Sequence, residues 1–206
     1  PLRLSALSWP VCPPLSPTFS GVCALLCCCC CMQAFVLFMM RDVQQVDDPR
    51  RITAQLAMIN QLSAALVAAP SGWLSDRLGR KPLVYASCCV MALVYLGFAL
   101  APSIDIVVWL SVAYGFGNGM FLSVDYALAC DTLPAQESAA QSLGVWGVSA
   151  FLGSTLGPLI AAPLLAYWGW TSSPDRYSAN GYTAVNLAGA VYVCLSGLFL
   201  CCVRAR

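Results

Sequence analysis

Six long apolar stretches constrain the fold of this chain more than any other feature. A helix that crosses a membrane needs about 20 mostly apolar residues, because the hydrocarbon core is about 30 Å thick and each helical residue rises about 1.5 Å. The six stretches cover residues 21–40, 53–74, 82–101, 104–130, 138–168 and 181–203. The sequence therefore predicts an all-α, polytopic membrane protein with six transmembrane helices.

The prolines fit these boundaries. Five of them fall at or near a predicted helix end: Pro49, Pro82, Pro102, Pro134 and Pro174. Three others lie inside a stretch: Pro70, Pro158 and Pro163. Neighbouring helices in a bundle can satisfy the carbonyl groups that such a proline leaves free, so we expect kinks at these three positions.

Composition supports a membrane protein and excludes several other classes. Only 9% of the residues are charged, against about 25% in an ordinary soluble domain. The net charge of +1 offers no basic surface for nucleic acid. The chain has no histidine, which removes the usual base of enzymes and a common metal ligand, so we expect neither an enzyme nor a metal or cofactor site. The 13 cysteines, an odd number that includes the run 27–31, do not form a disulfide framework and are expected to pack as small apolar groups.

The ends of the chain and its basic residues suggest an orientation. Residues 1–20 contain five prolines and are expected to be a disordered leader or a piece of a longer chain. Residues 21–203 form the membrane domain, and residues 204–206 form a short tail. Six Lys and Arg residues lie on the side of the termini and four lie on the other side. Since positive charge favours the cytoplasmic side, we predict cytoplasmic termini in an integral membrane protein, without a signal for a particular membrane.

The segment between the second and third stretches carries a specific pattern. Gly72-Trp73-Leu74-Ser75-Asp76-Arg77-Leu78-Gly79-Arg80-Lys81 matches every specified position of G-x-L-x-D-R-x-G-R-[RK]. We expect Gly72 to let two helices approach closely and Gly79 to allow a tight turn. The basic residues alone could be topology signals, but Asp76 and the two glycines are not needed for that. The pattern resembles the cytoplasmic loop signature of major facilitator superfamily transporters.

The resemblance extends over residues 21–203 and implies one six-helix half of the twelve-helix transporter fold. In the fifth stretch, Gly153, Gly157 and Pro158 resemble the family's G-x-x-x-G-P motif, although alanines follow where glycines are preferred. Without the family, these residues predict a small-residue packing face with a kink. The fourth stretch has no arginine over residues 107–118, and the first ends at residues 40–43 as a seventh helix would. We therefore favour the carboxy-terminal half, helices 7 to 12.

The fourth stretch holds the main candidates for solute contact. At about 100° per residue, four polar side chains lie within about 60° of one another. They are Ser111, Tyr114, Asn118 and Asp125. Gly115 and Gly119 lie on a separate flank suited to close helix packing. The resemblance implies that the first and fourth helices of each half line the central cavity, which adds Gln33 of the first stretch. Other polar residues within the stretches, among them Asn60, Gln61 and Asn186, are expected to be satisfied by neighbouring helices.

Asp125 has two interpretations. Buried in the membrane, its carboxylate could take up a proton or pair with a cationic solute. Alternatively, Asp125 or Asp131 pairs with Arg77 or Arg80, which the resemblance implies is a latch on the cytoplasmic side that stabilises the outward-facing state. Asp131, at the helix end, fits that latch better. The two aspartates lie about 240° apart on one helix, which disfavours a protease with a carboxylate dyad.

The sequence therefore predicts secondary active transport of a small polar solute by alternating access, with proton coupling as symport or antiport. The expected partners are the lipid bilayer, the solute and a second six-helix half, in the same longer chain or as a pairing subunit. The alternative is a non-transporting membrane fragment or a scaffold protein derived from a transporter half.

Overall fold

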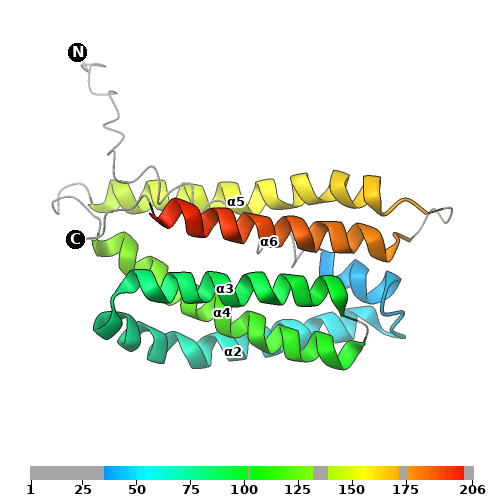
Figure 1. Cartoon of the computed structure of the whole chain (residues 1–206), viewed down its shortest axis with the longest axis horizontal. Helices are drawn as coiled ribbons and strands as arrows, with labels where there is room; N and C mark the ends of the chain where they lie inside the picture. Colours follow the sequence, from blue (N-terminus) through cyan, green and yellow to red (C-terminus); the bar gives the residue numbers. More distant parts are fainter. Residues whose placement is uncertain (1–34, 102, 132–138, 172–175, 202–206) are drawn as a thin grey trace, which may run out of the picture.

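A computed structural model describes residues 35–101, 103–131, 139–171 and 176–201 of the chain (Figure 1). The long helices of this part are α2 (Pro49–Leu78), α3 (Arg80–Leu100), α4 (Ile104–Asp131), α5 (Ala139–Trp168) and α6 (Ala179–Cys201). Each is long and apolar enough to cross a membrane. A further helical segment covers residues 35–42. The prediction of an all-α polytopic membrane protein is confirmed, whereas most of the first predicted span, residues 21–34, lies outside the described residues.

Local sequence explains where the helices begin and end. α2 begins at Pro49, earlier than predicted, because proline suits the first helical position and the Asp48 side chain accepts a hydrogen bond from the Arg51 backbone N–H at 3.3 Å. α2 and α3 are separated by Gly79 alone, whose φ of 91° lies in the left-handed region that favours glycine. α3 begins at Arg80 and contains Pro82, because proline is tolerated in the first turn of a helix.

The helices run roughly along the long axis of the molecule and pack in a fixed order. α4 packs against both α2 and α3, α3 also packs against α6, and α6 packs against α5 (Figure 1). Large side chains fill the contacts between helices. Met91 and Tyr95 of α3, Phe121 of α4 and Val193 of α6 are each at most 1% exposed. The core therefore lies around α3, the helix shared by the two sides of the bundle.

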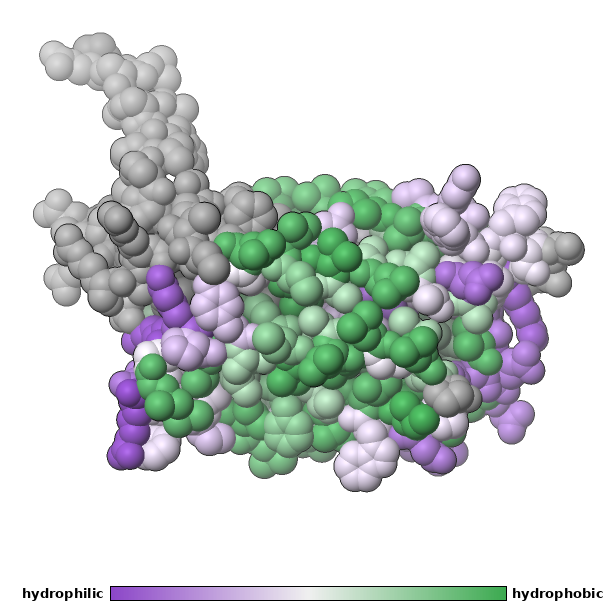
Figure 2. All heavy atoms as spheres, in the orientation of Figure 1, coloured by the Kyte–Doolittle hydropathy of each residue, from purple (hydrophilic) through white to green (hydrophobic). Residues whose placement is uncertain are grey.

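The outer surface is that of a membrane protein. Hydrophobic side chains cover the middle of the visible face, and hydrophilic side chains gather at its two ends (Figure 2). Large apolar side chains such as Leu66, Leu93, Phe151 and Leu198 are between 64% and 74% exposed. Exposed side chains of this size over so wide an area fit a surface covered by lipid or by another membrane protein.

The internal prolines leave the helices continuous. Pro70 lies inside α2, and Pro158 and Pro163 lie inside α5. The fifth predicted stretch accordingly forms a single helix, with Gly153 and Gly157 buried along it.

Candidate functional site: a polar pocket between α2 and α4

Two glycines bring α4 unusually close to α2. A Cβ atom at Gly115 would lie 2.5 Å from the Asn60 backbone oxygen and 2.7 Å from Ser63 Cβ. A Cβ atom at Gly119 would lie 2.6 Å from the Cα atom of Ala64. These distances are too short for any side chain, so the backbones of the two helices are in direct contact. The structure thus places both predicted packing glycines at a single helix–helix interface.

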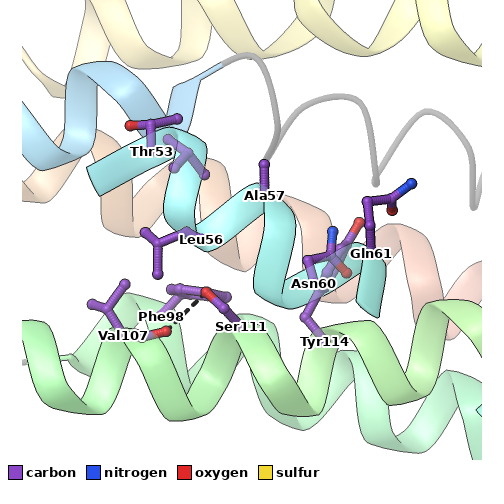
Figure 3. A pocket seen from close by; sticks show the side chains of 10 residues that line it. Thr53, Leu56, Ala57, Asn60, Gln61, Phe98, Val107, Ser111 and Tyr114 are labelled. Carbon is purple, nitrogen blue, oxygen red and sulfur yellow. Dashed lines mark hydrogen bonds between the residues drawn. The ribbon is translucent and has the colours of Figure 1, made fainter. Parts of the chain in front are cut away.

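A pocket of about 310 Å³ lies beside this interface (Figure 3). Its described lining residues come from α2, α4, the end of α3 and the segment 35–42. They are Val36, Thr53, Leu56, Ala57, Asn60, Gln61, Phe98, Val107, Ser111 and Tyr114. In Figure 3, Leu56 of α2 faces Val107 and Ser111 of α4, and Asn60 faces Tyr114 one turn further on. The pocket therefore combines an apolar wall with several hydroxyl and amide groups.

Asn60 Oδ1, on a side chain that is 8% exposed, and Thr53 Oγ1 are polar atoms of this pocket that are buried without a hydrogen-bond partner among the described residues. Within this part of the chain no neighbouring helix satisfies the Asn60 oxygen, and the same holds for Asn186 Oδ1 on α6, so the expectation that neighbouring helices satisfy these amides stays a prediction. A buried acceptor without a donor costs about 1–3 kcal/mol, so a group that supplies the donor would be stabilised there.

The α4 side of the pocket is held in place by local contacts. The Ser111 hydroxyl donates to the Val107 carbonyl at 2.9 Å, the bond drawn in Figure 3, which leaves its lone pairs available to accept. Tyr114 is 5% exposed and packs edge-on against Tyr95, with ring centroids 6.1 Å apart. Local contacts thus hold both polar α4 side chains that line the pocket, Ser111 and Tyr114.

The predicted polar stripe of α4 does not form one continuous site. Ser111 and Tyr114 line the pocket, whereas Asn118 is half-buried and is not among the described lining residues. Asp125 is buried, with 6% exposure, but lies eleven residues beyond Tyr114, about 16 Å further along the helix axis. Gln33 lies outside the described residues.

The loop signature forms the compact junction of α2 and α3. Nη2 of Arg80 lies 3.9 Å from Oδ1 of Asp76, one helical turn away. The Arg77 guanidinium lies over the Trp73 ring, 4.0 Å from its centroid. Lys81 is half-buried, and the Asp131 side chain lies outside the described part, so the latch stays a prediction.

The described helices do not show the close approach expected at Gly72. A Cβ atom at that position would meet no described atom within 4 Å. None of the described helices therefore approaches closely there, in contrast to Gly115 and Gly119, and the packing role of Gly72 stays a prediction.

A second polar cluster, which sequence reasoning missed, surrounds Asp42 at the opposite end of the bundle. Its Oδ1 accepts from Arg41 Nε at 2.7 Å, and its Oδ2 accepts from the Tyr182 hydroxyl at 2.7 Å and from the Tyr177 N–H at 3.1 Å. Burial by itself raises the pKa of Asp42, but these hydrogen bonds and the charge of Arg41 outweigh it and hold the pKa below its ordinary value. Asp42 thus fastens the end of the segment 35–42 to the start of α6.

Only a weak local signal marks these missed residues in the sequence. Tyr182 is 4% exposed and bonded to Asp42, 140 positions away, a contact that no local pattern marks. The adjacent polar residues Asn60 and Gln61 in the middle of an apolar stretch were the one local hint of the pocket.

The fold and the pocket define a polytopic helical membrane protein with an internal, partly polar binding cavity. Comparison with known proteins gives its family: the pattern described as Major Facilitator Superfamily matches residues 19–174. The chain belongs to this superfamily.

Several curated bacterial proteins are similar to part of the chain. A multidrug resistance protein B homolog of Mycobacterium tuberculosis is 33% identical over 113 residues, which are 53% of this chain and 20% of that protein. The uncharacterized MFS-type transporter YfkL of Bacillus subtilis is 33% identical over 55% of the chain and 28% of its own length. A triacylglyceride transporter of Mycolicibacterium hassiacum is 37% identical over 61% of the chain and 23% of its own length. The matched region thus spans between 20% and 28% of each of these relatives.

Proposed function

We propose that the chain is one half of a secondary active transporter that moves a small polar solute by alternating access, with the pocket between α2 and α4 as part of the solute site. The observation that carries this proposal is the pair of buried oxygens, Asn60 Oδ1 and Thr53 Oγ1, in a pocket that also offers Ser111 and Tyr114. Polar groups inside a membrane domain are costly and are kept where they bind or conduct something. Membership of a transporter superfamily, and relatives named for multidrug resistance and transport, support the same function.

The poorly buried surfaces of α2 and α5 favour a second six-helix half as the partner of this chain. In the most apolar part of α2 only 17% of the residues are buried, and in that of α5 only 22%, against 44% in α3, α4 and α6. The exposed face of α2 includes Gln61, twelve residues and about 18 Å into the helix. An amide at that depth would be poorly solvated by lipid. A protein surface or a water-filled cavity between two halves accounts for it, which supports a half-transporter; the assignment to the carboxy-terminal half rests on the sequences of the first and fourth stretches.

Asp125 is the candidate for proton coupling. It is buried in α4 between the pocket and the end of the helix that we assign to the cytoplasmic side. A carboxyl group at this position in a membrane helix could carry a proton in one state of the transporter and release it in the other. The loop signature, with Asp76, Arg77 and Arg80, lies at the same end of the bundle and would act there as the conformational latch together with Lys81 and Asp131.

Uptake into vesicles tests the proposal. The chain alone is compared with the chain paired with an amino-terminal half from the same transcript, with labelled chloramphenicol and labelled glucose as uncharged solutes and a pH-sensitive dye as the proton probe. We expect uptake only in the paired sample, abolished by Asp125→Asn and unchanged by Asp105→Asn, which removes an exposed carboxylate from the first turn of the same helix. Folded but inert pairs, or a transcript without a second half, would instead favour a non-transporting fragment or scaffold.

A further inference from the structure

We infer that the pocket between α2 and α4 selects an uncharged amphipathic solute that donates a hydrogen bond to Asn60. The inference rests on the proposed function, because it names the class of solute that the same pocket would take. The inference makes Asn60 a specificity-determining residue. Asn60 lies on α2, which packs against α4, the helix that carries the predicted polar stripe.

The absence of charge in the lining determines the charge of the solute. None of the described lining residues is Asp, Glu, Lys or Arg. An ion placed there would lose its water without gaining an opposite charge, and this desolvation is expensive in a membrane domain. Asp125, about 16 Å further along α4, is too far to neutralise a cation in the pocket. The lining therefore favours an uncharged molecule.

The unsatisfied oxygens determine the hydrogen-bonding character of the solute. A threonine hydroxyl can donate or accept, so Thr53 fits either kind of partner. An amide oxygen can only accept, and Asn60 Oδ1 lies buried at the pocket wall without a donor among the described residues. A solute with a hydroxyl or N–H group donates a hydrogen bond to this oxygen, whereas a solute that can only accept leaves the oxygen without a donor.

The remaining wall determines the body of the solute. Leu56, Phe98 and Val107 present apolar side chains, and a volume of about 310 Å³ lies at the small end of the range for ligand pockets. The complementary molecule is small and has an apolar ring or chain with one donor group at its edge.

Binding of a matched naphthalene series to the full chain in nanodiscs tests the inference. The probes are 1-naphthol, which is uncharged and donates, 1-methoxynaphthalene, which only accepts, and the charged 1-naphthylmethylammonium and 1-naphthoate. Fluorescence titrations are corrected with empty nanodiscs. Since one buried hydrogen bond is worth about 1 kcal/mol, we expect 1-naphthol to bind about fivefold more tightly than 1-methoxynaphthalene. Asn60→Leu should remove that preference.

Asn186→Leu is the matched control. Asn186 is 2% exposed, and its Oδ1 also has no hydrogen-bond partner among the described residues, but it lies on α6 and does not line the pocket. Its replacement should leave the preference for 1-naphthol unchanged. Thr53→Val supplies a second lining variant if Asn60→Leu does not fold. Because the Thr53 hydroxyl can donate or accept, its removal should weaken both probes alike and leave the preference for 1-naphthol, and loss of that preference would overturn the assignment of the preference to Asn60.

The outcomes separate this inference from the transport proposal. A charged probe that binds as tightly as 1-naphthol, equal binding of the methoxy compound, or the same preference in Asn60→Leu would each overturn the inference. Failure of all four probes to bind would overturn it too. The transport proposal is judged separately, by the presence of a second half in the transcript and by the vesicle experiment, which uses other solutes and a separate proton readout.

Discussion

The close contact between α4 and α2 predicts that a side chain at Gly119 destabilises the protein. Replacing Gly119 with alanine places a methyl group 2.6 Å from the Cα atom of Ala64, where ordinary contacts between carbon atoms begin near 3.5 Å. The obstacle is backbone, so no side-chain rotation can relieve the clash, and α4 must move away from α2 by several tenths of an ångström. Overpacking of this kind costs about 1–3 kcal/mol. The replacement of glycine by alanine in a helix stabilises the helix by about 0.5–1 kcal/mol, which offsets part of this cost. We therefore expect a net loss of about 1–2 kcal/mol.

The control for this prediction is Gly72→Ala on α2. The added methyl group there meets no described atom within 4 Å, so only the helix-propensity gain remains and the stability should rise or stay unchanged. The assay is equilibrium unfolding of both variants in detergent micelles, followed by circular dichroism. Equal stability of Gly119→Ala and Gly72→Ala would refute the close contact between α2 and α4. A loss in Gly72→Ala as large as that in Gly119→Ala would show that helix propensity and packing have been assigned to the wrong positions.

Two further predictions concern polar contacts. Ser71→Ala should cost about 1 kcal/mol in the same assay, because it removes the 2.7 Å hydrogen bond between the Ser71 and Ser123 hydroxyls that joins α2 to α4. The control is Ser154→Ala, which should cost less because the Ser154 hydroxyl bonds only within its own helix. Full additivity of the two changes in a double-mutant cycle of Ser71 and Ser123 would contradict the hydrogen bond between the helices. The lowered pKa of Asp42 means that the folded state favours its charged form, so the stability it contributes is complete above pH about 4 and is lost as the pH falls through the lowered pKa. The free energy of unfolding of Asp42→Asn should therefore be lower than that of the wild type at pH 7 and equal to it in acid. The control Asp47→Asn, which changes an exposed residue, should match the wild type at both pH values. A difference between wild type and Asp42→Asn that persists in acid would contradict the role of the Asp42 charge.

Helices could be predicted from the sequence, but not the contacts between them. Apolar length and the breakers Pro49 and Gly79 determine where helices form, since both act within a few residues of chain. Contacts such as that between Asp42 and Tyr182 join residues 140 positions apart, and no local pattern specifies them. The same limit explains the two outcomes for glycine. Gly72 and Gly119 look alike as small residues in apolar helices, but only the packing of α4 on α2 gives Gly119 a neighbour.

The candidate site shows a related limit of helical periodicity. The stripe on α4 correctly indicated that Ser111 and Tyr114 share a surface, because angular position depends on sequence alone. It could not indicate where along the helix a pocket ends, so Asn118 was grouped with the pocket residues and Asn60 was not. Depth along the axis depends on the neighbouring helices, and the opposite wall comes from α2.

The geometry of α2 bears both on the packing of the chain and on the proposed second half. Asn60 contributes its backbone oxygen to the contact with Gly115, and its side chain lines the pocket together with Gln61, the next residue, which is also exposed. A rise of 1.5 Å per residue puts both amides at almost the same depth, about 17 Å into the helix. One helix thus carries a buried amide and an exposed amide of the same pocket at the same level. Lipid would solvate the exposed Gln61 amide poorly, so a polar surface is the favourable cover for this edge of the pocket. A second half that closes over α2 would therefore complete the solute site and satisfy Gln61 in a single contact.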